Sequence, residues 1–227
     1  MKDPVPRSDF LDKKRDYSHL LVHLTREDSG VSAKEVLETI LDEQTLRVYH
    51  YYCIFQKEIS SLDEALQNKF KVVCFTETPI DQIEVLLERV EGRVFQPEPY
   101  GLVFKKDYIG EKGGNPVFYM PYHLSIPLWQ IFNNAKENQF SLGENRLLAL
   151  VNKCDNTIDF HWEREWRIVG DLEFKLEDLY CGLCEEDDIP YFEDNYKPVI
   201  FISPRWGIKR ILDKLVKNRK RGESPLL

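Results

Sequence analysis

The chain has 227 residues, of which 42% are hydrophobic and 12% aromatic, and its formal net charge is -8. This composition supports a sizeable core in one domain or two small ones. No apolar run approaches the roughly 18 residues that span a bilayer, and the charged start lacks the pattern of a signal peptide. We therefore expect a cytoplasmic protein without membrane contact. The acidic charge argues mildly against a protein that holds a nucleic-acid duplex by neutralising phosphates.

The first third of the chain alternates between predicted strands and helices. Residues 1–16 are predicted to form an arm, and Tyr17–Thr25 reads as the first strand. A capping box from Ser32 to Glu35 predicts a helix with an apolar face. Residues 45–55 are aromatic and β-branched, which predicts a strand or an extended, partly buried loop. A second capping box, from Ser61 to Glu64, predicts a short helix.

The middle of the chain continues with a short strand over 71–75. A helix is predicted to start at Thr78-Pro79 and to include Val90, because proline is favourable at the first helical position. Residues 101–104 and 116–120 flank the Gly-rich turn EKGGN, so they are predicted to form a hairpin or a pair of neighbouring strands. The following residues, 125–153, are the most helical part of the chain.

The last part of the chain contains a strand over 198–202 and a basic amphipathic helix and tail over 205–227. Basic residues dominate between Lys209 and Arg221, so the tail could meet nucleic acid or an acidic partner, although a solvated basic helix face is the preferred interpretation. Many short strands with helices grouped between them predict an α+β fold. We expect a single domain over 17–204 with a split, mostly antiparallel sheet and packed helices.

The cysteines are five and scattered, which predicts reduced thiols rather than a disulfide scaffold. Cys181-Gly-Leu-Cys184 supplies only two of the four ligands that a structural zinc ion needs. The sequence also lacks a Walker A loop, GxGxxG, HExxH and GxSxG. Because these motifs are missing, the sequence predicts no metal centre, phosphate loop or serine nucleophile.

Residues 159–170, DFHWEREWRIVG, are the richest in chemistry, and we interpret them as a strand. A period of two places Phe160, Trp162, Arg164, Trp166 and Ile168 on one face and His161, Glu163, Glu165 and Arg167 on the other. Alternate strand residues lie roughly 6.5–7 Å apart, so Glu163 and Glu165 could reach into one cleft. A helix is the alternative, because Trp162, Trp166 and Val169 also follow a helical spacing.

The order of several motifs resembles the AbiGi-type abortive phage-resistance proteins and their larger uncharacterised family. The motifs are LVHLT, VLETILDEQTLR, VVCFTETP, YGLVFKKDYIG, NPVFYM and EREWRIVG, and they span roughly residues 18–175. This resemblance implies a component of a bacterial anti-phage system, of the abortive-infection or toxin-antitoxin kind. It also implies a cognate toxin or antitoxin protein as a partner.

A more distant resemblance is to the DarT-like ADP-ribosyltransferases, toxins that use NAD to modify nucleic acid. It is carried by a strand with His-x-Thr, a Pro-apolar-Tyr strand and a late strand with Arg-Glu before an aromatic residue. The resemblance implies an ADP-ribosyltransferase-like fold with NAD as substrate. His23 and Thr25 would bind NAD, Glu165 would be the catalytic carboxylate, and Arg47, which follows the first helix, would be a further catalytic or phosphate-binding cation.

Elementary chemistry is consistent with such a site. Cleavage of the nicotinamide glycosidic bond passes through an oxocarbenium-like state, which a carboxylate beside the ribose stabilises. Glu165 suits that role, Glu163 suits positioning of the acceptor or the diphosphate, and Tyr119 could stack on nicotinamide. Transfer to a nucleic-acid or protein acceptor remains open. The structural alternative is that both glutamates simply pair with arginines across the sheet.

Two other functions compete with the transferase. A non-enzymatic antitoxin or regulatory partner would bind a cognate toxin, and relatives of the AbiGi type are labelled antitoxins. That hypothesis predicts a buried, paired Glu165 and an exposed apolar patch, whereas a transferase predicts an open pocket lined by His23, Thr25 and Glu165. A magnesium-dependent nuclease using Asp159, Glu163 and Glu165 ranks last, because the adjacent arginines would compete with the metal.

Overall fold

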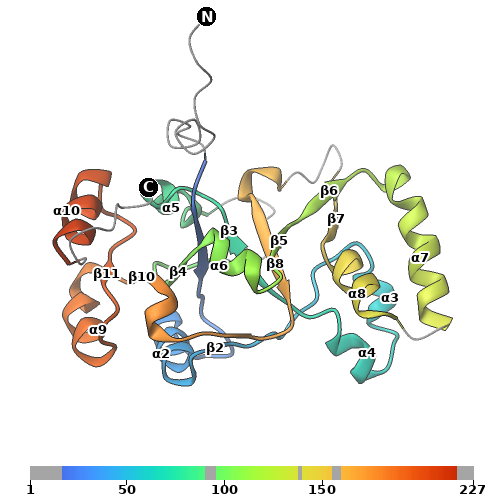
Figure 1. The fold of residues 1–227 in the computed structure, drawn as a ribbon, viewed down its shortest axis with the longest axis horizontal. Coiled ribbons are helices and arrows are strands. Elements are labelled where there is room, and N and C mark those ends of the chain that lie inside the picture. Colours follow the sequence, from blue (N-terminus) through green and yellow to red (C-terminus); the bar gives the residue numbers. More distant parts are fainter. Residues whose placement is uncertain (1–16, 90–95, 138–139, 155–159, 219–227) are drawn as a thin grey trace, which may run out of the picture. The chain divides into compact units, whose positions relative to one another are not determined.

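The computed structural model describes residues 17–89, 96–137, 140–154 and 160–218, and the chain divides into two compact units (Figure 1). The described residues of unit 1 fall within Met1–Gln44, Glu77–Tyr108 and Phe174–Leu227, and those of unit 2 within Thr45–Thr76 and Ile109–Glu173. Each unit therefore combines segments that are distant in sequence. The predicted arm, Val90, Asp159 and the tail after Asn218 lie outside the described residues.

Unit 1 is built on strands in the order β11, β10, β4 and β1, with the first pair parallel and the other two antiparallel. Its elements are β1 (Leu20–Leu24), α2 (Ala33–Glu43), η1 (Ile80–Gln82), α5 (Ile83–Leu86), β4 (Gly101–Lys105), η4 (Leu176–Asp178), β10 (Leu179–Leu183), η5 (Glu186–Asp188), α9 (Ile189–Asn195), β11 (Phe201–Ile202) and α10 (Ile208–Asn218). Helix α6 (Lys106–Glu111) begins in unit 1 and ends in unit 2. Helices α9 and α10 lie beside β10 and β11 (Figure 1).

The core of unit 1 lies between this sheet and α10. Leu20 and Val22 of β1 pack in one buried cluster with Val103 of β4 and with Ile211 and Leu215 of α10. Burying each large aliphatic side chain contributes about 1.5–3 kcal/mol, which explains why the amphipathic α10 docks by its apolar side. Gly101 is required in this sheet, because a Cβ there would collide with the backbone oxygen of His23 on the paired strand.

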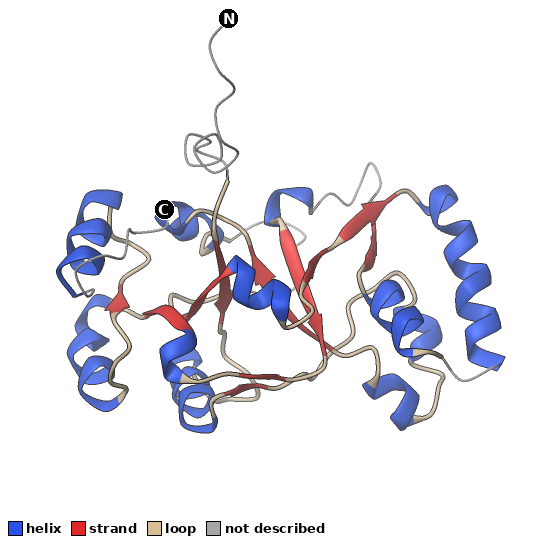
Figure 2. Ribbon diagram, viewed as in Figure 1, coloured by secondary structure: helices blue, strands red, loops and turns tan. Residues whose placement is uncertain are grey.

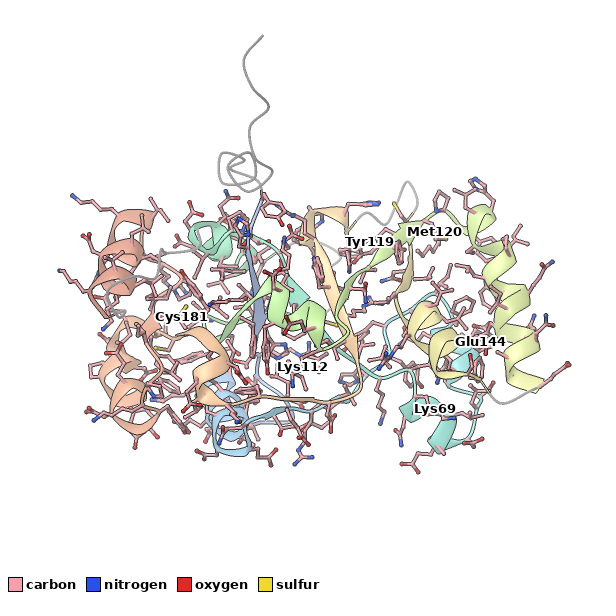
Figure 3. The ribbon with its side chains drawn as sticks, in the orientation of Figure 1. Lys69, Lys112, Tyr119, Met120, Glu144 and Cys181 are labelled. Atoms are coloured by element: carbon pink, nitrogen blue, oxygen red, sulfur yellow. The ribbon has the colours of Figure 1, made fainter. Side chains whose placement is uncertain are left out.

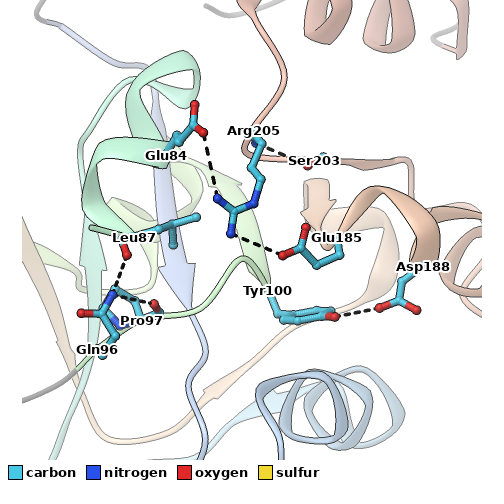
Figure 4. A network of polar contacts seen from close by, with 9 residues as sticks. All are labelled: Glu84, Leu87, Gln96, Pro97, Tyr100, Glu185, Asp188, Ser203 and Arg205. Atoms are coloured by element: carbon cyan, nitrogen blue, oxygen red, sulfur yellow. Dashed lines mark hydrogen bonds and ion pairs between the residues drawn. The ribbon is translucent and has the colours of Figure 1, made fainter. Parts of the chain in front are cut away.

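Ion pairs and hydrogen bonds hold the loops around this core (Figure 4). The Tyr100 hydroxyl donates to Asp188 at 2.7 Å, and the same carboxylate accepts a 2.7 Å bond from Lys34 Nζ. Arg205 lies 3.4 Å from Glu185 and 4.0 Å from Glu84. The Arg205 pairs are exposed and add little stability, so the buried apolar contacts determine this arrangement.

Unit 2 contains three small groups of strands (Figure 2). Strands β3, β8 and β5 pair antiparallel in that order, β2 pairs antiparallel with β9, and β6 pairs in parallel with β7. The elements are β2 (Thr45–Leu46), α3 (Gln56–Ile59), α4 (Glu64–Asn68), β3 (Val72–Thr76), β5 (Asn115–Pro116), β6 (Phe118–Met120), η2 (Tyr122–Ser125), α7 (Ile126–Glu137), α8 (Leu142–Ala149), β7 (Val151–Lys153), η3 (His161–Glu163), β8 (Glu165–Val169) and β9 (Leu172–Glu173).

Aromatic side chains form the core of unit 2. Phe55 stacks on Phe132 of α7 with ring centroids 4.9 Å apart, and Phe70 meets Phe140 edge to face at 5.0 Å. Such offset and edge-to-face pairs add about 0.5–1.5 kcal/mol to the burial of each ring pair. The aromatic run at 51–55 therefore serves packing, and of the predicted strand over 45–55 only Thr45–Leu46 pairs as a strand, so the loop alternative holds for the rest.

The predicted strand over 159–170 is wrong at its beginning. His161–Glu163 forms a turn of 3₁₀ helix, and Arg164 then adopts a left-handed conformation with φ 47° and ψ 49°. A residue in that conformation cannot extend a strand, so β8 starts only at Glu165. The two-face alternation consequently applies to Glu165–Val169 and not to the residues before it.

Two further local predictions also need correction. Strand β4 does not pair with the residues at 116–120: α6 follows it directly, and its neighbours are β1 and β10. The helix predicted to be capped by Ser61 starts at Glu64, with Asp63 as its N-cap. The capping box from Ser32 to Glu35 is confirmed.

The chain is thus a mixed α and β protein with mostly antiparallel strands and packed helices, as the sequence predicts at this coarse level. Whether 17–204 forms one transferase-like domain stays a prediction. Among the described residues, no helix is both long and apolar enough to cross a membrane.

Candidate functional site

Glu165 and Arg167 form a tight ion pair on β8. They are two residues apart on a strand and therefore share a face, as predicted. Arg167 Nε lies 2.8 Å from Glu165 Oε1, and Nη2 lies 2.9 Å from Oε2. Only 1% of the Arg167 side chain and 12% of the Glu165 side chain are exposed. This two-pronged geometry is the strongest form of an arginine–carboxylate contact, and both carboxylate oxygens take part in it.

The guanidinium also contacts the end of a helix. Arg167 Nη1 donates to the carbonyl oxygen of Ala149 at 2.9 Å, and Ala149 is the last residue of α8. The last carbonyls of a helix have no partner within the helix and carry partial negative charge, so they favour a cation. Burial opposes the charge on Arg167, but its neighbours, the Glu165 carboxylate foremost, together offset burial and raise the pKa of the guanidinium.

Tyr119 completes this group from β6. Its hydroxyl donates to Glu165 Oε2 at 2.7 Å, and Figure 3 labels it beside Met120 on the same strand. Burial and the nearby Glu165 carboxylate raise the pKa of the phenol, which therefore remains protonated and a donor at neutral pH. We call Tyr119, Glu165 and Arg167 the Tyr–Glu–Arg group.

Cys74 lies opposite Arg167 on the paired strand β3. Burial raises the pKa of its thiol, and the neighbouring Glu165 carboxylate adds to that effect. A high pKa keeps the thiol protonated and unreactive. Cys74 is therefore part of the packing around the Tyr–Glu–Arg group rather than a nucleophile.

The other predicted residues of unit 2 surround this group differently. The Glu163 backbone oxygen accepts a 2.6 Å hydrogen bond from the Thr76 hydroxyl, and the negative charge of Glu163 contributes to the raised pKa of Tyr119. Arg47 is exposed and follows β2. The structure thus brings Tyr119 and Glu165 into direct contact.

His23 and Thr25 belong to unit 1. Thr25 is only 3% exposed, and its hydroxyl oxygen lies 3.0 Å from the carbonyl oxygen of Ala33 and 3.2 Å from that of Tyr100. This places the Thr25 hydroxyl in a structural role, where it fastens the end of β1 to the start of α2. His23 is half-buried on β1, opposite Leu102 of β4.

A surface that the sequence interpretation did not single out lies in unit 2. Phe118, Tyr122, Leu124 and Ile126 have exposed fractions of 49%, 57%, 60% and 51%. We call Phe118–Ile126 the apolar segment. Residues 113–135 contain no Lys, Arg, Asp or Glu, although 31% of the chain is charged. That absence is the sequence signal that could have identified this surface.

The acidic and thiol residues do not form a metal site within the described part of the chain, where no cluster of three or more His, Cys, Asp or Glu could hold an ion. Cys181 and Cys184 are both fully buried at β10 (Figure 3 labels Cys181). The Cys184 backbone amide donates to Ile202 at 3.2 Å, which makes this pair part of the sheet. Asp159, the third acid of the nuclease hypothesis, lies outside the described residues.

Comparisons of the chain with models of protein families, with curated proteins and with solved structures find no match.

Proposed function

We propose that this chain acts by binding a partner protein through the apolar segment, as the antitoxin or regulatory component of a bacterial anti-phage module. The observation that carries the proposal is the cluster of exposed Phe118, Tyr122, Leu124 and Ile126 on a stretch without charged residues. The resemblance to the AbiGi-type family supports the defence context and a toxin as partner.

The chemistry of the apolar segment suits a protein interface. The centres of interfaces are depleted of charged residues and enriched in aromatic residues, and large exposed apolar patches mark interaction sites. Tyr122 and Phe118 are aromatic, and Pro121 and Pro127 are exposed beside them. Removing this surface from water requires no desolvation of a charge. The matching surface of the partner is therefore apolar.

The state of Glu165 supports binding over transfer. Its two carboxylate oxygens accept bonds from Arg167, and one of them accepts a further bond from Tyr119. A catalytic carboxylate must present an oxygen to the ribose, and Glu165 would first have to give up contacts with a buried guanidinium. Leaving a buried charge without its partner costs about 3–5 kcal/mol.

The test places a photo-crosslinking residue at Leu124 and, as a matched control, at Val85 of unit 1, which is 61% exposed where Leu124 is 60%. The chain is expressed in cells of its source organism during phage infection. We expect a protein to crosslink at position 124 and not at 85. With that protein purified, Leu124→Asp should weaken binding by about 2 kcal/mol, roughly thirtyfold in Kd, and Val85→Asp should leave it unchanged.

The proposal fails if nothing crosslinks at position 124, if the crosslinked species is a second copy of the chain, or if Leu124→Asp binds as tightly as the unmodified protein. Circular dichroism of both Asp variants separates loss of binding from loss of folding.

A second candidate is NAD-dependent ADP-ribosyl transfer on an ADP-ribosyltransferase-like fold. It is favoured by the 2.7 Å contact of Tyr119 with Glu165, because the sequence predicts both at one site, Glu165 as the catalytic carboxylate by resemblance and Tyr119 as a ring that could stack on nicotinamide. The test offers labelled NAD with RNA, DNA and cell lysate. Transfer that Glu165→Gln abolishes supports an enzyme, with Arg47→Gln as a further loss-of-function variant. No label and no nicotinamide release from the unmodified protein would exclude it.

A further inference from the structure

A thiol and an imidazole meet at the edge of the Tyr–Glu–Arg group. Cys154 directly follows β7, and its backbone amide donates to the carbonyl oxygen of Met120 at 3.0 Å, which continues the parallel pairing of β6 and β7. His161 is the first residue of η3. Cys154 Sγ lies 3.6 Å from His161 Nδ1, a hydrogen-bond distance for sulfur. In the tautomer whose Nδ1 lacks a proton, the thiol donates to a potential base.

Packing holds the imidazole in this position. The ring of Tyr119 lies 5.1 Å from that of His161 at an angle of 51°, and the Tyr119 hydroxyl is fixed by Glu165. The Arg164 amide donates to the His161 carbonyl oxygen at 3.1 Å and closes the 3₁₀ turn that carries the ring. The side chain of His161 is therefore held between the ring of Tyr119 and the sulfur of Cys154.

Of the five cysteines, Cys154 has the surroundings that most favour reaction with a small reagent. None is in a disulfide, and all five lie in the described part of the chain. Cys53, Cys181 and Cys184 are buried, and burial raises the pKa of Cys53 to about 11. Cys74 is also half-buried, but it lies within the β3–β8 pair, where burial and then the Glu165 carboxylate raise the pKa of its thiol. Cys154 is half-buried and its histidine partner is exposed, so a small reagent can approach this thiol.

We propose that Cys154, with His161 as its base, is a site of covalent modification by low-molecular-weight disulfides. The thiol proton passes to His161 Nδ1, and the sulfur attacks one sulfur of the disulfide. The old S–S bond breaks, a mixed disulfide forms on Cys154, and the leaving thiolate takes the proton from the imidazolium. The cysteine sulfur is oxidised and the released half of the reagent is reduced, so no further oxidant is needed.

Disulfide exchange fits this pair better than acyl transfer. Exchange needs a sulfur that a small reagent can reach and a nearby acceptor for the thiol proton, which Cys154 and His161 provide. Acyl transfer also needs donors arranged around a developing oxyanion. Cys154 and His161 contact Met120 and Tyr119 of the apolar segment, so the modification is tested on the purified chain without a partner, where its outcome does not depend on partner binding.

The experiment exposes the full reduced chain to oxidised glutathione at neutral pH, quenches timed samples with iodoacetamide and quantifies each cysteine by peptide mass spectrometry. We expect Cys154 to form the mixed disulfide at least about tenfold faster than any other cysteine. His161→Gln should slow Cys154 severalfold. His50→Gln, an exposed histidine of the same unit, is the matched control and should leave the rate unchanged.

The proposal is overturned if another cysteine reacts first, or if Cys154 reacts equally fast with and without His161. The rates are measured again in concentrated denaturant, where the folded pair is absent. There the unmodified chain and His161→Gln should react alike, and a difference that persists would overturn the role of the folded geometry. Circular dichroism confirms that both histidine variants fold.

Discussion

Arg167 has a full charge at a position where almost none of its side chain reaches water. Three acceptors compensate it: the two oxygens of Glu165 and the carbonyl of Ala149 at the end of α8. A buried ion pair of this kind adds little net stability over an apolar pair, but the loss of one partner leaves an uncompensated charge. The pair therefore constrains which substitutions unit 2 tolerates.

We predict that Arg167→Met lowers the free energy of unfolding by about 3–5 kcal/mol, because Glu165 then remains buried without its cation. The double variant Glu165→Gln/Arg167→Met should recover most of this loss, since the neutral amide still accepts the Tyr119 hydrogen bond. Urea denaturation measures both. Equal instability of the single and double variants would show that packing, and not charge, explains the loss.

At the scale of elements, helix starts depend on one or two hydrogen bonds. Ser32 caps α2: its hydroxyl accepts from the Glu35 amide at 3.3 Å, and the Glu35 carboxylate accepts from the Ser32 amide at 2.9 Å. The Ser32 hydroxyl also donates to the Glu35 carboxylate at 2.7 Å, and this bond, followed by the one from the Ser32 amide, lowers the pKa of Glu35. Ser61 has a similar sequence context, yet its hydroxyl donates to the Glu58 carbonyl of the preceding helix.

The resulting prediction compares two serines. Ser32→Ala should cost about 1 kcal/mol of stability, because it removes the N-cap of α2. Ser61→Ala should change stability by less than about 0.5 kcal/mol, whereas Asp63→Ala, at the true N-cap of α4, should cost about 1 kcal/mol. Thermal and urea unfolding measure the three losses of stability. A loss for Ser61→Ala as large as that for Ser32→Ala would show that Ser61, and not Asp63 alone, caps α4.

At the scale of the whole molecule, the surroundings of several tyrosines in both units raise the pKa of the phenol and keep it protonated. Burial, and secondarily a carboxylate, raises the pKa of Tyr100, Tyr108 and Tyr196 in unit 1 and of Tyr119 in unit 2. In the unfolded chain these phenols ionise at about pH 10. Above that pH the folded state therefore binds more protons than the unfolded state.

Because the folded state binds more protons above pH 10, the free energy of unfolding should fall as the pH rises beyond that value. The stabilisation is fully present below about pH 10 and is lost as the pH rises through the folded-state values. We expect the urea midpoint to fall above pH 10, and Tyr108→Phe and Tyr196→Phe to make the fall less steep. If the urea midpoint of both variants fell with pH as steeply as that of the unmodified protein, these tyrosines would not be the cause of the fall.

The sequence by itself determined the features that depend on neighbours along the chain. The capping box of α2, the short apolar runs of β1 and β3, the amphipathic α10 and the shared face of Glu165 and Arg167 all follow from local spacing. The physical reason is that a capping bond or a repeat of two or 3.6 residues involves only adjacent turns or alternate residues.

Tertiary structure alone decided the partners that are distant in sequence. The pairing of β4 with β1 and β10, the Ala149 carbonyl that meets Arg167, the Tyr119 hydroxyl on Glu165 and the approach of Cys154 to His161 have no local signal. Local spacing also failed within one segment. The pattern of residues 159–170 predicts a strand, but the left-handed conformation of Arg164 interrupts it, so the strand begins only at Glu165. Burial and charge compensation, which involve all the surrounding elements, determine these contacts.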